Sequence, residues 1–195
     1  MKNYRIIRIV AFAIALIAAA SVLCSCGKDS TQTVKISVQN YGDIIIELRP
    51  DVAPITVENF KKLVSEGFYD GLTFHRVVKG FMIQGGDPNG NGTGSSSEKI
   101  KGEFSANGVN NTLSHTRGVI SMARGTSYNS GSCQFFITNA DASTDLDGKY
   151  AAFGVVIEGM DVVDAISDVE VTYNLFGEKS SPVEKIIIES ITFVE

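Results

Sequence analysis

The chain of 195 residues contains only three cysteines, two histidines and no tryptophan. Cys24 and Cys26 lie together near the N-terminus, so processing of that segment would leave Cys133 alone and exclude an internal disulfide framework. Neither His75 nor His115 has a partner at metal-ligand spacing. We therefore interpret both as structural histidines whose hydrogen bonds are satisfied, and we expect no metal site.

The chain also has fewer basic residues than acidic ones. The chain has 17 lysines and arginines against 22 acidic residues, a formal net charge of −5 and a pI of about 5.1. This balance lacks the basic face of a typical nucleic-acid-binding domain, so no nucleic-acid partner is expected. Hydrophobic residues make up 44% and charged residues 20%, which is typical of a globular protein. The length suits one domain with a sizeable core.

One uninterrupted apolar run, residues 9–20, follows Lys2, Arg5 and Arg8. It is shorter than the roughly 20 residues needed to cross a bilayer, and it has the length of a secretory signal sequence. Residues 23–27 (LCSCG) then resemble the lipobox of bacterial lipoproteins. The resemblance predicts cleavage before Cys26 and lipidation of its sulfur.

The expected organisation is therefore a lipoprotein signal peptide at 1–25, a lipidated cysteine and tether at 26–32, and a folded domain at 33–195. The protein would be exported and anchored to the lipid bilayer of a bacterial membrane, on the cell surface or the periplasmic face. An ordinary signal peptide cut after residues 18–20, or an uncleaved anchor, remains open.

The folded part predicts a mainly β protein. Val34, Ile36 and Val38 alternate with polar residues, as in a half-buried strand. A helix is expected at 56–66, with Thr56 as a plausible N-cap, and a second at 160–167. Many short strands with glycine-rich turns favour an antiparallel barrel or sandwich. Further strands are expected at 44–48, 72–78, 81–84, 118–122, 134–138 and 152–157, with one or two at 185–194.

Several other site types can be considered. Cys133 could form a nucleophilic Cys-His pair with one of the histidines, but no nucleophile signature surrounds it. We therefore interpret it as a small buried residue in a strand. The glycine-rich residues 85–94 lack the Lys-Ser/Thr ending of a P-loop. Asp141, Asp145 and Asp147 lack calcium-loop spacing and are interpreted as a solvated acidic loop.

Four blocks carry a more specific signal. They are residues 74–87 (FHRVVKGFMIQGGD), 118–124 (GVISMAR), 131–137 (GSCQFFI) and 146–154 (LDGKYAAFG). Together, in this order and at these separations, they resemble the cyclophilin family of peptidyl-prolyl cis-trans isomerases (EC 5.2.1.8). The resemblance covers about residues 34–194. It implies a closed eight-stranded antiparallel β-barrel capped by two short α-helices.

The resemblance also implies a function and a site. The chain would accelerate rotation of Xaa–Pro bonds in exported, proline-containing polypeptides and assist their folding, as a monomer and without a cofactor. Arg76 would be the catalytic hydrogen-bond donor, and Gln84 would orient it. The substrate would contact Phe81, Met82, Ala123, Arg124, Gln134, Phe136, Leu146 and Tyr150.

Three positions depart from the family pattern. Asp145 replaces the tryptophan common there, which implies weak binding of cyclosporin-type inhibitors. Tyr150 replaces a histidine, and Arg124 replaces an asparagine, which would alter the preference for the residue before proline, towards acidic ones. A non-catalytic binding module, such as a surface chaperone, is the alternative. The presence of Arg76 with Gln84 and the apolar pocket residues favours activity.

Overall fold

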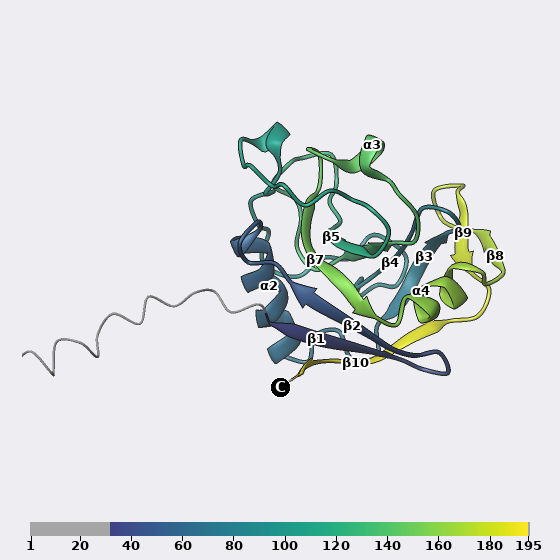
Figure 1. The fold of residues 1–195 in the computed structure, drawn as a ribbon. Coiled ribbons are helices and arrows are strands. Elements are labelled where there is room, and N and C mark those ends of the chain that lie inside the picture. Colours follow the sequence, from purple (N-terminus) through teal and green to yellow (C-terminus); the bar gives the residue numbers. More distant parts are fainter. Residues whose placement is uncertain (1–31, 195) are drawn as a thin grey trace, which may run out of the picture. The chain divides into compact units, whose positions relative to one another are not determined.

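The computed structural model describes residues 32–194, and the expected signal peptide, Cys26 and most of the tether lie outside them. The mainly β prediction is confirmed: eight strands form a closed barrel in the order β1-β10-β3-β4-β6-β5-β7-β2, with every neighbouring pair antiparallel (Figure 1). The barrel strands are β1 (Thr33–Val38), β2 (Gly42–Leu48), β3 (Thr73–Val78), β4 (Met82–Gly85), β5 (Val119–Met122), β6 (Phe135–Thr138), β7 (Ala151–Glu158) and β10 (Ile186–Val194).

The remaining elements lie around this barrel. Helix α2 (Pro54–Ser65) contacts β7 and β10, and helix α4 (Met160–Ser167) contacts β2, β3 and β4. The sequence did not predict helix α3 (Ser143–Leu146), the 3-10 turn η1 (Ser105–Asn107) or the hairpin of β8 (Val171–Tyr173) and β9 (Lys179–Pro182). This hairpin lies beside β3, at the edge of the barrel (Figure 1). Within residues 32–194, no helix has the length and apolar character to cross a membrane.

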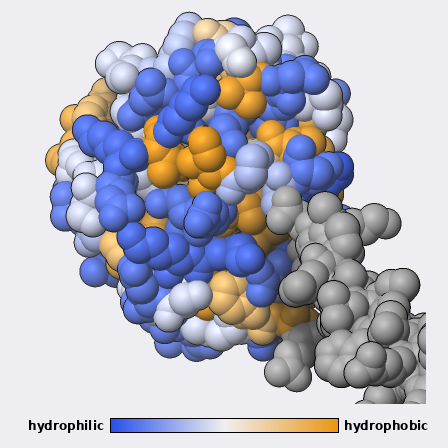
Figure 2. Space-filling model, turned by 90° about the vertical axis from the view of Figure 1, so that its left-hand side faces the viewer, coloured by the Kyte–Doolittle hydropathy of each residue, from blue (hydrophilic) through white to orange (hydrophobic). Residues whose placement is uncertain are grey.

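Alternating strand residues fill the barrel, as the pleat of a β-strand requires. Val34, Ile36 and Val38 are buried in β1, and Phe135 joins the same core. Phe60 of α2 closes one side, with its ring 5.7 Å from that of Phe135 and nearly perpendicular to it. Figure 2 shows one face of the molecule, on which apolar residues form separate patches among hydrophilic ones.

The expected N-cap of the first helix was wrong. Helix α2 begins at Pro54, and its N-cap residue is Ala53, which has no side chain that could accept a hydrogen bond. The buried carboxylate of Glu103 takes that role from elsewhere in the chain. It accepts hydrogen bonds from the backbone N–H groups of Ile55 and Thr56 and from the Thr56 hydroxyl. A carboxylate suits the partial positive charge of a helix N-terminus.

Candidate active site around Arg76

A β-bulge in β3 places Arg76 opposite Gln84. The register pairs Phe74 with Gly85 and Arg76 with Gln84, so the extra residue of β3 is His75. Phe74 and Val77 therefore point into the core, while Arg76 lies on the outer face. Arg76 Nη1 donates to Gln84 Oε1 at 3.2 Å. The two residues expected to be catalytic thus lie in direct contact.

A second apolar cluster lies outside the main core, on the same face as Arg76. Its buried members are Met82, Phe136, Ala142 and Leu146, with Val78, Phe81, Ala123 and Tyr150 packed against them. Six of these eight residues, together with Arg76, Gln84 and Arg124, line a small cavity of about 210 Å³. Nine of the ten residues expected to form the site line this cavity: Arg76, Phe81, Met82, Gln84, Ala123, Arg124, Phe136, Leu146 and Tyr150.

The tenth residue, Gln134, does not line the cavity but connects Gln84 to the glycine-rich loop. Gln84 Nε2 donates to Gln134 Oε1 at 2.9 Å, and Gln134 Nε2 donates to the carbonyl of Gly94 at 2.8 Å. Asp87 in turn accepts hydrogen bonds from three backbone N–H groups of that loop. The amide of Gln84, and through it Arg76, is therefore fixed by a chain of hydrogen bonds.

The floor of the cavity is supported by His115. Its ring stacks on that of Phe136, with centroids 6.1 Å apart. Its Nδ1 lies 2.8 Å from an Asp147 oxygen, and its Nε2 lies 2.9 Å from the Ser121 hydroxyl. Asp141, Asp145 and Asp147 are all exposed, as expected of a solvated acidic loop, but Asp147 also accepts hydrogen bonds from Ser114 and from the His115 backbone. His115 is a satisfied structural histidine, as expected.

The other histidine differs from the prediction. His75 is buried, yet neither ring nitrogen has a hydrogen-bond partner within residues 32–194. Burial lowers the pKa of both histidines, and in His115 this outweighs the opposing effect of Asp147. Burial therefore disfavours the protonated form of both rings in the folded protein.

The lowered pKa values of His75 and His115 predict that stability depends on pH. As pH falls below 6.5, the unfolded chain binds protons that the native state does not bind, so the free energy of unfolding should fall. Urea unfolding at about pH 7.5, 6.5 and 5.5 measures this dependence. Replacing His75 with phenylalanine should flatten part of the slope. An unfolding free energy that is constant over this range would contradict the prediction.

Arg124 lies at the rim of the cavity, and its guanidinium is close to three aromatic rings. Its guanidinium carbon is 4.6 Å from the ring centroid of Tyr150, 5.1 Å from that of Tyr128 and 5.3 Å from that of Phe104. Arg124 Nε donates to the backbone carbonyl of Lys149 at 2.9 Å. The Arg124 guanidinium is thus held beside this cavity by cation–π contacts.

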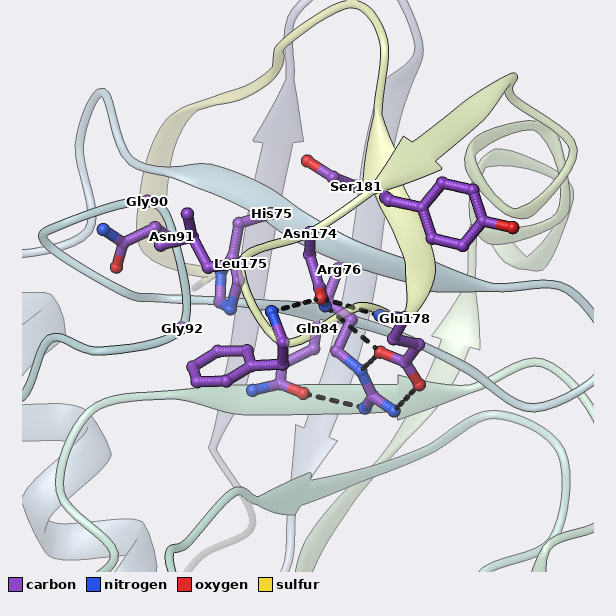
Figure 3. Close-up of a pocket in the computed structure, with 12 residues that line it drawn as sticks. His75, Arg76, Gln84, Gly90, Asn91, Gly92, Asn174, Leu175, Glu178 and Ser181 are labelled. Carbon is purple, nitrogen blue, oxygen red and sulfur yellow. Dashed lines mark hydrogen bonds and ion pairs between the residues drawn. The ribbon is translucent and has the colours of Figure 1, made fainter.

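One charged residue of the site was missed by the sequence analysis. Glu178, just before β9, forms a bidentate ion pair with Arg76, which is 102 positions away along the chain. Figure 3 shows this pair beside a larger cavity of about 480 Å³, which Arg76 and Gln84 also line. The hydrogen bonds from Arg76 lower the pKa of the Glu178 carboxyl to about 2. No sequence pattern links these two positions.

Other site types fit the structure poorly. Cys133 is fully buried, and burial raises the pKa of its thiol, so it is not a ready nucleophile. The glycine-rich residues 85–94 form a bend, in which Gly86 has a φ of +80° and a Cβ would lie 2.7 Å from the Cys133 carbonyl oxygen. Among residues 32–194, no cluster of three or more potential ligands could hold a metal ion.

Comparisons with known proteins identify the family of this chain. Residues 33–193 match the family described as cyclophilin type peptidyl-prolyl cis-trans isomerase/CLD. Over 165 residues the chain is 42% identical to peptidyl-prolyl cis-trans isomerase B of Escherichia coli, covering 80% of this chain and 96% of that protein. A relative from Acinetobacter baylyi is 42% identical over 153 residues, covering 76% and 79% of the two chains.

Solved structures show the same likeness. A cyclophilin-type isomerase of Cryptosporidium parvum superposes with a TM-score of 0.75 at 32% identity, covering 85% of this chain and 98% of that one. The same protein in the presence of the dipeptide Ala-Pro gives a TM-score of 0.74 at 32% identity, covering 84% and 99%.

Proposed function

This chain belongs to the cyclophilin-type peptidyl-prolyl cis-trans isomerase family, and we propose that Arg76 and the adjoining apolar cavity carry out this isomerisation on exported polypeptides. The reaction breaks no covalent bond. Amide resonance alone opposes rotation, with a barrier of about 18–20 kcal/mol. Before proline, the cis and trans forms differ by only about 0.5–1 kcal/mol, yet they exchange over tens to hundreds of seconds. The protein therefore needs only to lower this barrier.

The cavity supports the first part of the mechanism. Its apolar walls, among them Phe136, Met82 and Leu146, match the ring of proline in character, and its small volume of about 210 Å³ suits a single side chain. When the proline ring is immobilised in the cavity, the carbonyl before proline can rotate relative to a fixed nitrogen. The His115 ring stacks on the far side of Phe136 and supports this wall of the cavity.

Arg76 supplies the second part. When the proline nitrogen becomes pyramidal, its lone pair no longer delocalises into the carbonyl, and it can accept a hydrogen bond. A donor fixed in advance beside that nitrogen favours this state over the planar ground state. Arg76 Nη1 donates to two residues that line the cavity, at 3.2 Å from Gln84 Oε1 and 3.6 Å from Met82 Sδ.

The contact between a fixed guanidinium and an apolar cavity is the observation that carries this proposal. Its test is NMR exchange between the cis and trans forms of short Xaa–Pro peptides. We expect catalytic amounts of protein to bring exchange, which is slow without a catalyst, onto the NMR timescale. Well-folded protein that binds the peptides without accelerating exchange would instead favour the binding-module alternative.

We extend the proposal to the location of the protein. The basic and apolar N-terminal sequence and the lipobox-like residues 23–27 support export, cleavage before Cys26 and anchoring by lipid. The clients would then be proline-containing polypeptides that fold outside the cytoplasm, and the domain would act on them as a monomer. Two or more acyl chains are needed for stable anchoring.

The anchor predicts a change in fractionation. Replacing Cys26 with serine removes the sulfur that would carry the lipid, so the protein should leave the membrane fraction. Cell fractionation and intact-mass analysis of both forms measure this, with Cys133→Ser as the control that keeps Cys26. Equal membrane association of the Cys26→Ser variant would support an uncleaved apolar anchor instead.

A further inference from the structure

The β8–β9 hairpin brings an acidic side chain to the catalytic arginine. Arg76 Nε donates to Glu178 Oε2 at 2.6 Å, and Arg76 Nη2 donates to Glu178 Oε1 at 2.7 Å (Figure 3). A bidentate pair of this kind fixes the plane of the guanidinium as well as its position. Glu178 comes from outside the barrel, whereas Arg76 and Gln84 belong to its adjacent strands β3 and β4.

The pair engages one particular edge of the guanidinium. Glu178 occupies the edge formed by Nε and Nη2, which leaves Nη1 for Gln84 and the sulfur of Met82. Gln84 and Met82 both line the proline cavity. The carboxylate therefore does not bind the nitrogen that contacts the cavity-lining residues. It holds the opposite edge, so that this nitrogen has one orientation.

Glu178 is itself held in place. Its carboxylate accepts a hydrogen bond from the Ser180 hydroxyl at 2.8 Å. The turn before it is built around Asn174, whose Oδ1 accepts from the backbone N–H groups of Phe176 and Glu178. Asn174 Nδ2 also donates to the Ser180 hydroxyl at 3.0 Å. These contacts fix the carboxylate before any substrate arrives.

Because solvent screens this pair, we expect it to contribute little to folding, which separates its role from a structural one. The side chains of Arg76 and Glu178 are 29% and 41% exposed, and partly exposed pairs contribute little to stability. A single orientation of the donor, in contrast, matters for a reaction that depends on preorganised hydrogen bonding, because small misplacements reduce rates strongly.

We propose that Glu178 is a positioning residue, which orients the Arg76 guanidinium so that Nη1 faces the substrate in the proline cavity. This inference rests on the proposed function of Arg76. The hairpin would then be part of the catalytic machinery, although its residues need not touch the peptide bond that rotates.

The experiment compares the full chain with its Glu178→Gln variant. Glutamine keeps the size of the side chain but loses the charge and one acceptor oxygen. We expect kcat for a short Xaa–Pro peptide, measured by NMR exchange at saturation, to fall about tenfold, with KM within about twofold of the original value. Thermal stability should be unchanged within about 2 °C. Glu178→Asp, which keeps the charge, should restore part of the lost kcat.

Two further variants make the result specific. Glu170→Gln removes the same charge from an exposed position just before β8, and it should keep full activity. In Arg76→Lys, which cannot form the bidentate pair, adding Glu178→Gln should have much less effect than it has alone. Unchanged or increased kcat in Glu178→Gln, beside an active parent, would overturn the positioning role. An inactive parent would instead contradict the proposed function.

Discussion

Replacing Arg76 with alanine is expected to reduce kcat/KM for Xaa–Pro isomerisation by about 100-fold to 1,000-fold, the range seen when one preorganised donor is removed from an active site. This corresponds to roughly 3–4 kcal/mol of transition-state stabilisation. The variant should stay folded, because Glu178 is partly exposed and water can solvate the carboxylate that loses its partner. NMR exchange of the same peptides measures the loss.

Arg117 offers a matched control. It also forms a bidentate pair, with Asp164, and its side chain is 45% exposed, but it does not line either cavity at Arg76. Arg117→Ala should therefore keep full activity. If Arg76→Ala retained most of the activity while folded, grip on the proline ring would be the main source of catalysis, and the role proposed for Arg76 would be wrong.

Replacing Glu103 with alanine is expected to lower the free energy of unfolding by about 3 kcal/mol, or Tm by roughly 8 °C. Glu103 is only 2% exposed. Its loss would leave two backbone N–H groups at the start of α2 and the buried Thr56 hydroxyl without their partner. Unpaired buried donors are expensive, and the favourable charge at the helix N-terminus would also be lost.

Thermal and urea unfolding of Glu103→Ala measure this effect. The control is Glu98→Ala, which removes the same side chain from an exposed pair with Lys62, where little stability should be lost. Similar unfolding free energies for the two variants would mean that water replaces the Glu103 carboxylate at the helix end. Isomerase activity of the folded fraction should be close to normal in both.

Regular stretches of the fold could be read from the sequence because each residue there follows its local pattern. Val34, Ile36 and Val38 alternate, and β1 contains all three; the helix expected at 160–167 has those bounds in the structure. The start of α2 could not be placed in this way. Its capping group is Glu103, distant in sequence, and the sequence pattern shows only a proline and a threonine near the helix start.

The geometry of the site depended on two features that no periodicity reveals. Strict alternation would put Arg76 on the same face as Phe74, in the core, and only the bulge at His75 turns it outwards. Only the resemblance to the cyclophilin family identified Arg76 as the catalytic residue. Glu178 could not be found at all, because Ser180 is the one fully buried residue of its short hairpin, which leaves no periodic pattern, and its partner lies on another element.

The first barrel strand, β1, pairs along its whole length with the last, β10, from Thr33 opposite Val194 to Val38 opposite Ile188. If the chain is exported N-terminus first, as proposed, β1 crosses the membrane long before its partner strand. The barrel could then close only after translocation is nearly complete. Any chaperone that binds the chain during export would then have to cover β1 until β10 has also crossed the membrane.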